Sequence, residues 1–502
     1  MNETIDFHRF GEEFWNIADV LRADIVKVTE YLEEFSYFLF LKLLDDRERQ
    51  EEKLIKLDGK VFIPLIPEKY RFYNWAENPE RWAKNHDFRT SIEFLNQMFL
   101  DLSRVDDEVD SKERIVKDRN LIRKIFRNHI IRLRYDRTIT ELTRKLTGLN
   151  LRSASYDVIG RAFEFLVNKL GEQGQYGQYF TPRHIVDFMV KMIDPKIGET
   201  IYDPAAGTGG FLVWAYEHIA QNIEREVIDA AEQEIKIREL KHNLFGTEKA
   251  PDVFKLGVMN LVLHGDGSAN LIEGDSLSAP AQDANRNRYD VILTNPPFGP
   301  LPYDPSGVFT YSARLFEALF LQHLMSSIKR GGRAATVMKE GLLFSSSPRA
   351  LYNIRKRLVD EYNLIAVVSM PSGVFMPYTG SKTSILLFER PKDKDSPKTN
   401  LVWFYKIDND GFDLGATRRP IPENDLPGAL EKFNNREESE KSWLVDVEEI
   451  RKNDYNLTAN RYCSFEVKEV EYEKPEVLIT QLLDLENEIQ TGLMELLSII
   501  NK

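Results

Sequence analysis

The sequence predicts an α/β fold with a mainly parallel seven-stranded sheet, an N-terminal helical domain before it and a C-terminal helical tail after it. Between residues 151 and 395, short apolar runs alternate with amphipathic runs of helical length, which is typical of a parallel sheet with helices on both faces. Apolar residues also recur at helical spacing before residue 150 and after residue 474. The seven strand candidates are ETIYDPA, HNLFGTE, NLIEGDS, YDVILTNPP, RAATVMK, LIAVVSM and TSILLFE.

A chain of 502 residues is too long for one typical domain. Its apolar fraction of 42 % is enough for a large core. We expect an N-terminal helical domain at residues 1–150 and an α/β domain at residues 151–395. An irregular C-terminal extension is expected at residues 396–473, followed by a C-terminal helix for subunit contact at residues 474–502.

Composition restricts the location and the partners of the chain. No window of about 20 apolar residues predicts a membrane span, and the N-terminus lacks the pattern of a secretory signal. With a single cysteine, Cys463, this favours a cytoplasmic protein. The scattered histidines predict no metal site. The net charge is −13, so binding to nucleic acid would need a local basic groove or a partner that shares the contacts.

The N-terminal 150 residues are predicted to be mostly helical. Apolar residues follow helical spacing from Phe14 to Leu44, and again between residues 112 and 145. We see no glycine-rich phosphate loop and no catalytic cluster in this part of the sequence. It is therefore expected to be a packing or recognition domain.

The first chemical motif follows the first predicted strand, at Asp203. Glycines allow a sharp turn and a close approach of a ligand to the backbone, and the next helix directs unpaired N–H groups at that ligand. The run does not match G-x-G-x-x-G, which speaks against a dinucleotide. The expected binding residues in this turn are Asp203, Ala205, Gly207, Thr208, Gly209 and Gly210.

Acidic residues end the next two predicted strands. Glu248 closes the second strand, where a carboxylate can accept hydrogen bonds from both hydroxyls of a ribose. Asp275 ends the third strand and could accept a hydrogen bond from an adenine amino group of the cofactor. Each signal is weak alone, but their order at successive strand ends makes them reinforce one another.

The strongest motif is Asn295-Pro296-Pro297-Phe298, directly after the apolar strand that ends at Thr294. Two prolines cannot continue a strand or a helix, so the chain leaves the sheet in a fixed shape. The Asn295 side-chain oxygen and the Pro296 carbonyl can each accept one hydrogen of an amino group on a base. These bonds favour a tetrahedral nitrogen whose lone pair can attack, and Phe298 can stack on an extruded base.

The C-terminal parts carry weaker patterns. Residues 396–473 mix charged runs with loop residues and predict short elements packed on the α/β domain. Pro475 suits a first helical position. The apolar residues after it follow steps of three and four, as in a coiled-coil seam, and could pack on the same chain or on a partner. They are Leu478, Leu482, Leu485, Ile489, Leu493, Leu496 and Ile500.

These motifs resemble those of the amino-methyltransferases that act on adenine N6. The resemblance implies a Rossmann-like S-adenosylmethionine-dependent methyltransferase core, in which the glycine-rich turn binds the cofactor and the Asn-Pro-Pro-Phe motif is catalytic. A further segment looks like the part of that family that cradles the methionine end of the cofactor. It consists of Gln178, Tyr179, Phe180, Thr181, Pro182 and Arg183.

Along nearly its whole length the chain is similar to the methylation subunit of type I restriction–modification systems. The stretches GQYFTPRHIVDFMV, DPAAGTGGFL, ILTNPPFG, PSGVFMPYTGSKTSILLFER and NDYNLTANRY follow in the expected order. One departure is Lys339, where a proline is expected after the fifth strand. The resemblance implies a site-specific, adenine-specific DNA methyltransferase that acts on double-stranded DNA.

The same resemblance implies partners. Such subunits bind a separate specificity subunit, usually as two copies per complex, and contact a restriction subunit with motor and nuclease activity. The tail after Pro475 is the candidate for docking on the specificity subunit. No Walker loop is present in the sequence, so ATP hydrolysis would belong to the restriction subunit.

Other readings remain open. The same motif occurs in enzymes that methylate protein glutamine, RNA bases or cytosine N4, because the chemistry at the amino nitrogen is shared. A non-catalytic scaffold that binds the cofactor is a second alternative, against which the intact Asn295 argues. A nicotinamide-dependent oxidoreductase is a third, weaker one.

Overall fold

The computed structural model describes the chain in two compact units, Met1–Arg461 and Tyr462–Lys502. Gln178, Tyr179 and Phe180 lie outside the described residues, as do four of the apolar residues predicted for the tail: Leu478, Leu482, Leu496 and Ile500. The described residues are 7–25, 27–57, 61–104, 122–149, 160–163, 165–166, 181–264, 270–303, 307–376, 379–393, 396, 398–415, 418–463, 479–480, 483, 485–486, 489–494 and 497.

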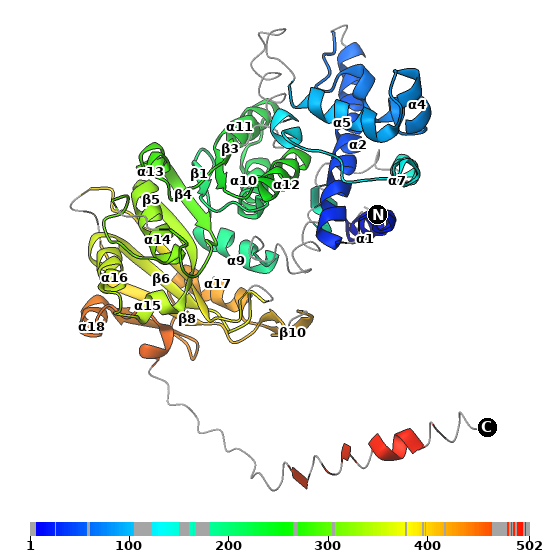
Figure 1. Cartoon of the computed structure of the whole chain (residues 1–502). Coiled ribbons are helices and arrows are strands. Elements are labelled where there is room, and N and C mark those ends of the chain that lie inside the picture. Colours follow the sequence, from blue (N-terminus) through cyan, green and yellow to red (C-terminus); the bar gives the residue numbers. More distant parts are fainter. Residues whose placement is uncertain are drawn as a thin grey trace. The chain divides into compact units, whose positions relative to one another are not determined.

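A nine-stranded sheet with the order β11-β8-β6-β7-β5-β4-β1-β2-β3 forms the centre of the first unit (Figure 1). Five strand pairs are parallel, and β7 runs antiparallel to both of its neighbours. The seven predicted strands are all present, as β1 to β7. Their bounds are β1 Ile201–Asp203, β2 Leu244–Glu248, β3 Asn270–Glu273, β4 Tyr289–Thr294, β5 Ile328–Lys339, β6 Asn363–Ser369 and β7 Thr383–Glu389.

The sheet has nine strands where the sequence predicted seven, because residues 396–473 contribute two further strands. Strand β8 (Leu401–Lys406) pairs in parallel with β6, and β11 (Ser442–Asp446) pairs antiparallel with β8. Four central residues of β8 are buried, so its aromatic run extends the core. The predicted boundaries at residues 150, 395 and 473 remain proposals. The other elements of this stretch are β9 Asp410–Phe412, β10 Pro420–Asn424, α17 Leu426–Asn435, α18 Val447–Lys452 and η5 Ala459–Arg461.

Two groups of helices contact the sheet. Neighbouring residues of β1 point to opposite faces: Ile201 joins the main apolar core, whereas Tyr202 contacts His323 of α14, with ring centroids 5.9 Å apart. One group contains α9 Arg183–Ile193, α10 Gly210–Glu226, α11 Ala230–His242 and α12 Pro251–Leu263. The other contains α13 Ala279–Asn285, α14 Phe316–Ser327, α15 Glu340–Phe344 and α16 Arg349–Glu361.

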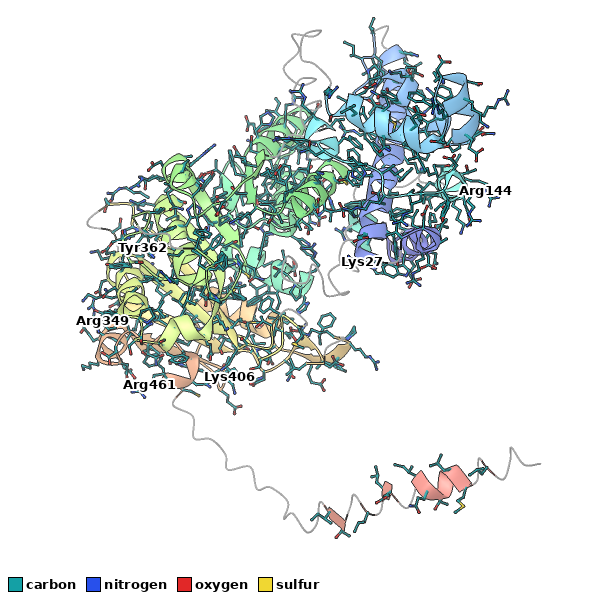
Figure 2. All side chains as sticks on the ribbon, in the orientation of Figure 1. Lys27, Arg144, Arg349, Tyr362, Lys406 and Arg461 are labelled. Carbon is teal, nitrogen blue, oxygen red and sulfur yellow. The ribbon has the colours of Figure 1, made fainter. Side chains whose placement is uncertain are left out.

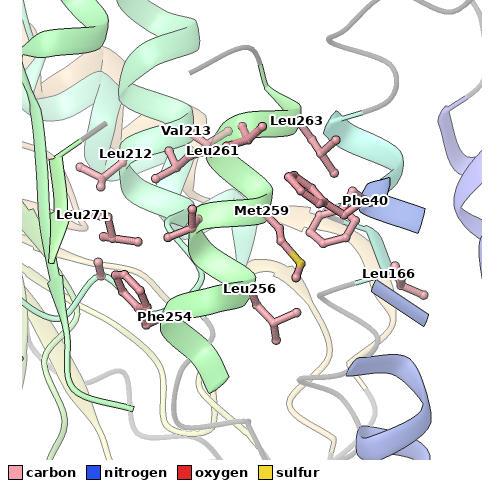
Figure 3. Close-up of a cluster of buried hydrophobic side chains, with 14 of the residues drawn as sticks. Phe40, Leu166, Leu212, Val213, Phe254, Leu256, Met259, Leu261, Leu263 and Leu271 are labelled. Atoms are coloured by element: carbon pink, nitrogen blue, oxygen red, sulfur yellow. The ribbon is translucent and has the colours of Figure 1, made fainter. Parts of the chain in front are cut away.

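Helix α12 is apolar on nearly all sides because other elements cover it on both faces. A helix of this kind is expected to be buried. Phe254 packs near Leu271 of β3, whereas Met259 points toward Phe40 of the N-terminal helices (Figure 3). All four of these side chains are at most 1 % exposed. The helix therefore joins the α/β sheet to the N-terminal helical part.

The N-terminal part is helical, as predicted. The Phe14–Leu44 stretch is divided between α1 and α2 by a short 3-10 helix, and Asp24 in this break accepts hydrogen bonds from the N–H groups of Arg134 and Tyr135. The element bounds are α1 Phe7–Ala18, η1 Asp19–Ala23, α2 Val28–Leu57, η2 Glu68–Tyr70, α3 Phe72–Trp75, α4 Pro79–Asn85, α5 Ser91–Leu102 and α7 Asp136–Gly148.

The surface of the first unit carries charged side chains from all its parts. Lys27 and Arg144 are exposed on the N-terminal helices, and Arg349 is exposed at the start of α16 (Figure 2). Within the described residues, no helix is both long and apolar enough to cross a membrane.

Candidate active site

A pocket of about 440 Å³ opens where β1, β2, β3 and β4 end. Ligands bind at this carboxyl edge in open α/β sheets, because loops there lead from several strands to one place. Twelve of the predicted site residues line it: Thr181, Arg183, Asp203, Ala205, Gly207, Thr208, Gly210, Glu248, Asp275, Asn295, Pro297 and Phe298. Pro182, Gly209 and Pro296 are described but are not among the lining residues.

Asp203 ends β1 and is 1 % exposed. Its Oδ1 accepts hydrogen bonds from the Thr294 hydroxyl at 2.7 Å and from the Ala205 N–H at 3.0 Å. Burial raises the pKa of Asp203 to about 7, although these two hydrogen bonds oppose the rise. A positive charge in the pocket would favour its ionised form.

The glycine-rich turn is shaped by positive φ angles and supported by α12. Gly207 has φ +55° and Gly209 has φ +80°, a region that glycine enters without strain. Asn260 Nδ2 donates to the Thr208 carbonyl at 2.9 Å, and Gly257 lies directly against the Gly207 carbonyl. Because Gly209 is the N-cap of α10, the turn brings the N-terminus of a helix to the pocket.

Glu248 joins the end of β2 to this turn. Its Oε2 accepts from the Gly207 N–H at 2.9 Å, and its Oε1 accepts from the Ala250 N–H at 2.7 Å. Burial raises the pKa of Glu248, and these backbone N–H groups counteract the rise. Each carboxylate oxygen can accept a further bond, so Glu248 can hold the turn and still bind hydroxyl groups.

Asp275 lies at the edge of the pocket next to two residues that the sequence did not identify. Its Oδ2 accepts from Lys249 Nζ at 2.7 Å and from the Tyr303 hydroxyl at 2.9 Å. The Lys249 ammonium also lies 5.2 Å from the centroid of the Tyr303 ring. Burial alone would raise the pKa of Asp275, but the hydrogen bonds from Lys249, Leu277 N–H and Tyr303 outweigh it and lower the pKa.

Asn295 follows β4 and is one of the residues that line the pocket. Its Nδ2 donates to Thr181 Oγ1 at 3.1 Å. Its Oδ1 is buried, and among the described residues it has no hydrogen-bond partner. A buried acceptor without a partner is costly, and such groups mark places where a ligand supplies the missing bond.

The loop after Asn295 is tied to α14. The Gly299 N–H donates to Glu317 Oε2, and the Phe316 N–H donates to the Gly299 carbonyl, both at 2.9 Å. Gly299 has φ +99°, a conformation that strains other residues. Phe316 and Phe320 add an apolar wall to the pocket. Nothing in the sequence separated them from ordinary core phenylalanines.

Comparison with known proteins decides the family. The pattern of the family described as N-6 DNA Methylase matches residues 154–471, and that described as HsdM N-terminal domain matches residues 11–146. The first match covers more than half of the chain. The chain belongs to the N-6 DNA methylase family.

The relatives of this methylase include methylase subunits of type I restriction enzymes. It is 30 % identical to the EcoEI methylase subunit of Escherichia coli over 461 residues, covering 88 % of each chain. It is 26 % identical to the EcoKI methylase subunit of Escherichia coli strain K12, covering 90 % of this chain and 84 % of that one. The resemblance to the type I methylation subunit is thereby confirmed.

Solved structures agree with the fold. A chain from a study of complex assembly and conformational transition of the type I restriction–modification system superposes with a TM-score of 0.71 at 28 % identity, over 99 % of both chains. A modification subunit from Vibrio vulnificus YJ016 gives 0.72 at 27 % identity, over 90 % of this chain and 94 % of that one. The prediction of a methyltransferase-type α/β core is confirmed.

Lys339, where the resemblance implied a proline, is the last residue of β5. Burial raises the pKa of Glu317, and the charge of Lys339 opposes part of that rise. Glu317 is the carboxylate that accepts the Gly299 N–H. Among the described residues of the methylase, no cluster of three or more His, Cys, Asp or Glu could hold a metal ion.

Proposed function

We propose that the pocket binds S-adenosylmethionine and an adenine base extruded from DNA, and that Asn295 directs the transfer of a methyl group to N6 of that base. The observation that carries this proposal is the buried Oδ1 of Asn295, which has no hydrogen-bond partner among the described residues and belongs to a residue that lines the same pocket as the glycine-rich turn. An acceptor of this kind fits an amino hydrogen. The proposal rests on residue roles in a family whose members methylate DNA at N6.

The chemistry of the pocket fits the cofactor. Its volume of about 440 Å³ lies within the range of about 300–1,000 Å³ for small-molecule sites. S-adenosylmethionine supplies a methyl group on a positively charged sulfur. Asp203 and Glu248 provide acidic groups for the cationic and hydroxyl parts of such a molecule, and the start of α10 offers N–H groups to its carboxylate.

The remaining site residues are assigned by their positions. Ala205, Gly207, Thr208 and Gly210 line the pocket and would contact the cofactor through the backbone. Arg183, at the start of α9, packs against Gly210, where its positive charge can attract a carboxylate. Asp275 would serve the adenosine end, with Lys249 and Tyr303 beside it. Gln178, Tyr179, Phe180 and Pro182 remain predicted from the resemblance.

The catalytic motif acts on the base. Asn295 Oδ1 and the Pro296 carbonyl each accept one hydrogen of the amino group, so that the nitrogen becomes tetrahedral and its lone pair points to the methyl group. S-adenosylmethionine would supply the methyl group: its carbon–sulfur bond would break as the nitrogen–carbon bond forms, S-adenosylhomocysteine would be the leaving group, and the nitrogen would then lose one proton to solvent. Phe298 stacks on the base and Pro297 keeps the loop rigid.

We also propose a complex with a specificity subunit, a restriction subunit and double-stranded DNA, with two copies of this chain, in the cytoplasm. The net charge of −13 supports shared DNA contacts. In the second unit, Leu485, Ile489 and Leu493 are each more than half exposed. Their spacing fits a helical seam for the specificity subunit.

The test is methylation by the complex of this chain with the specificity subunit encoded beside it. The complex is incubated with labelled S-adenosylmethionine and DNA, and the DNA is digested to nucleosides. We expect N6-methyl-2′-deoxyadenosine from the wild type and a loss of at least about 100-fold in Asn295→Ala, with unchanged cofactor binding. Asn435→Ala, on the exposed end of α17, is the matched control.

Three outcomes would contradict the proposal. Label in cytosine, or label in RNA or protein glutamine when these replace the DNA, would show a different amino substrate. Undiminished methylation by Asn295→Ala would remove this residue from the mechanism, whereas a wild-type complex that binds cofactor but methylates nothing would indicate a scaffold.

A further inference from the structure

Two distant segments of the chain meet at one hydrogen bond in the pocket. Thr181 lies two residues before α9, and Asn295 follows β4, 114 positions further along the chain. The bond runs from Asn295 Nδ2 to Thr181 Oγ1 at 3.1 Å, and both residues line the pocket. The bond therefore uses the donor side of the carboxamide, while Oδ1 has no hydrogen-bond partner among the described residues.

The orientation of a carboxamide decides what it can do to an amino group. Turning the group by half a revolution exchanges its oxygen and its nitrogen with almost no change in shape. In one orientation an acceptor faces the hydrogens of a bound amine. In the other orientation, the NH₂ group of the asparagine faces the hydrogens of the bound amine, so that hydrogen-bond donors lie opposite donors. Only the first orientation can favour the tetrahedral nitrogen that methyl transfer requires.

We infer that Thr181 is a positioning residue that holds the Asn295 carboxamide with its oxygen toward the substrate. Sequence resemblance placed Thr181 with the cofactor-binding residues; its hydrogen bond gives it a separate role in the chemical step. This inference rests on the proposed function of Asn295.

The backbone around Thr181 is suited to that role. The Pro182 carbonyl accepts hydrogen bonds from the N–H groups of Ile185 and Val186, at 2.9 and 3.1 Å, which fixes the start of α9. Ile185 and Val186 are both fully buried, so α9 is anchored in the core. The Thr181 hydroxyl therefore lies two residues before a helix that is anchored in the core, and sites next to regular elements are positioned more precisely than sites on loops.

The test compares Thr181→Val with Thr181→Ser in the complex with the specificity subunit. Valine keeps the shape of threonine but cannot accept the hydrogen bond. We expect Thr181→Val to lower kcat by about tenfold, because the carboxamide can then turn and shift, while the Kd for S-adenosylmethionine changes by less than about twofold. Thr181→Ser keeps the hydroxyl, so its kcat should stay within about threefold of the wild type.

The control is Thr147→Val, which removes a hydroxyl that bonds to the Thr143 carbonyl within α7 and should leave kcat unchanged. A wild-type kcat in Thr181→Val would overturn the inference. So would a parallel loss of cofactor binding, which would make Thr181 a cofactor ligand, or a Thr181→Ser variant as impaired as the valine variant. Failure of the wild-type complex to methylate DNA would instead refute the proposed function, so the two failures are distinguishable.

Discussion

Gly257 in α12 offers a direct test of how the glycine-rich turn is held. A Cβ atom at Gly257 would lie 2.9 Å from the Gly207 carbonyl oxygen and 3.4 Å from the Thr208 carbonyl carbon. Both are backbone atoms of the turn, and they cannot rotate away as the end of a side chain can. The substitution Gly257→Ala therefore forces α12 and the turn apart.

The size of the effect follows from this contact. Ordinary van der Waals contact begins at 3.4 Å, so the Gly207 oxygen must move by about 0.5 Å. Overpacking of this kind costs about 1–3 kcal/mol, and the better helix propensity of alanine returns about 1 kcal/mol. We expect a net loss of up to about 2 kcal/mol in unfolding free energy. A displaced turn should also weaken cofactor binding about tenfold, or about 1.4 kcal/mol.

The assay is calorimetric titration of the purified chain with S-adenosylmethionine, together with thermal unfolding in its absence. Gly148→Ala is the matched control, because a Cβ atom at Gly148, the last residue of α7, would meet nothing within 4 Å. That variant should bind like the wild type and be equally stable or slightly more stable. If Gly257→Ala binds the cofactor with wild-type affinity, the turn does not depend on this packing.

Three further predictions concern charged groups. Because the pKa of Asp203 is about 7, its carboxylate loses its charge as the pH falls below 7. Cofactor affinity, measured by titration, should therefore decrease as the pH is lowered from 8 to 6. An affinity that does not change with pH would contradict this prediction. The folded chain also binds more protons than the unfolded chain between the ordinary pKa of Asp203 and 7, so its stability without cofactor should fall as pH rises through that window. Asp203→Asn should reduce this fall in urea unfolding, because one of the buried carboxyls that cause it is removed, and should weaken cofactor binding. Arg333 donates to both Glu199 oxygens at 2.7 and 2.8 Å and to two backbone carbonyls. Arg333→Lys should therefore lower the free energy of unfolding in urea by about 2 kcal/mol, whereas Arg357→Lys, in an exposed helical pair with Glu361, should lower it by less than about 0.5 kcal/mol. Equal losses in the two variants would refute this distinction.

The strands of the methylase core could be predicted because each is a local pattern. An apolar run such as Tyr289–Thr294, bounded by turn residues, needs no knowledge of its neighbours. The direction of a strand is not local: β7 runs antiparallel between β5 and β6, and nothing in its own residues specifies that. Strands β8 and β11 were missed because they lie among charged and loop residues, and their burial comes from a sheet edge built by distant residues.

The site was predictable to the extent that topology brings strand ends together. Asp203 and Glu248 end β1 and β2, Asn295 directly follows β4, and β1 pairs with both of the other strands. The three side chains therefore line one pocket, as their order along the sequence suggested. Lys249 and Tyr303 could not be predicted, because their contacts with Asp275 depend on the paths of two loops.

Helix α12 explains why the helical N-terminal part and the methylase core belong to one structure. Its Gly257 and Asn260 support the glycine-rich turn, while Met259 faces Phe40 of α2. A helix that meets water on one side would need polar residues there, yet α12 is apolar where α2 covers it. Helix α12 therefore depends on α2 for the burial of its apolar side chains, and it also supports the glycine-rich turn. A change at the α2–α12 contact would consequently reach the glycine-rich turn of the pocket through Gly257 and Asn260.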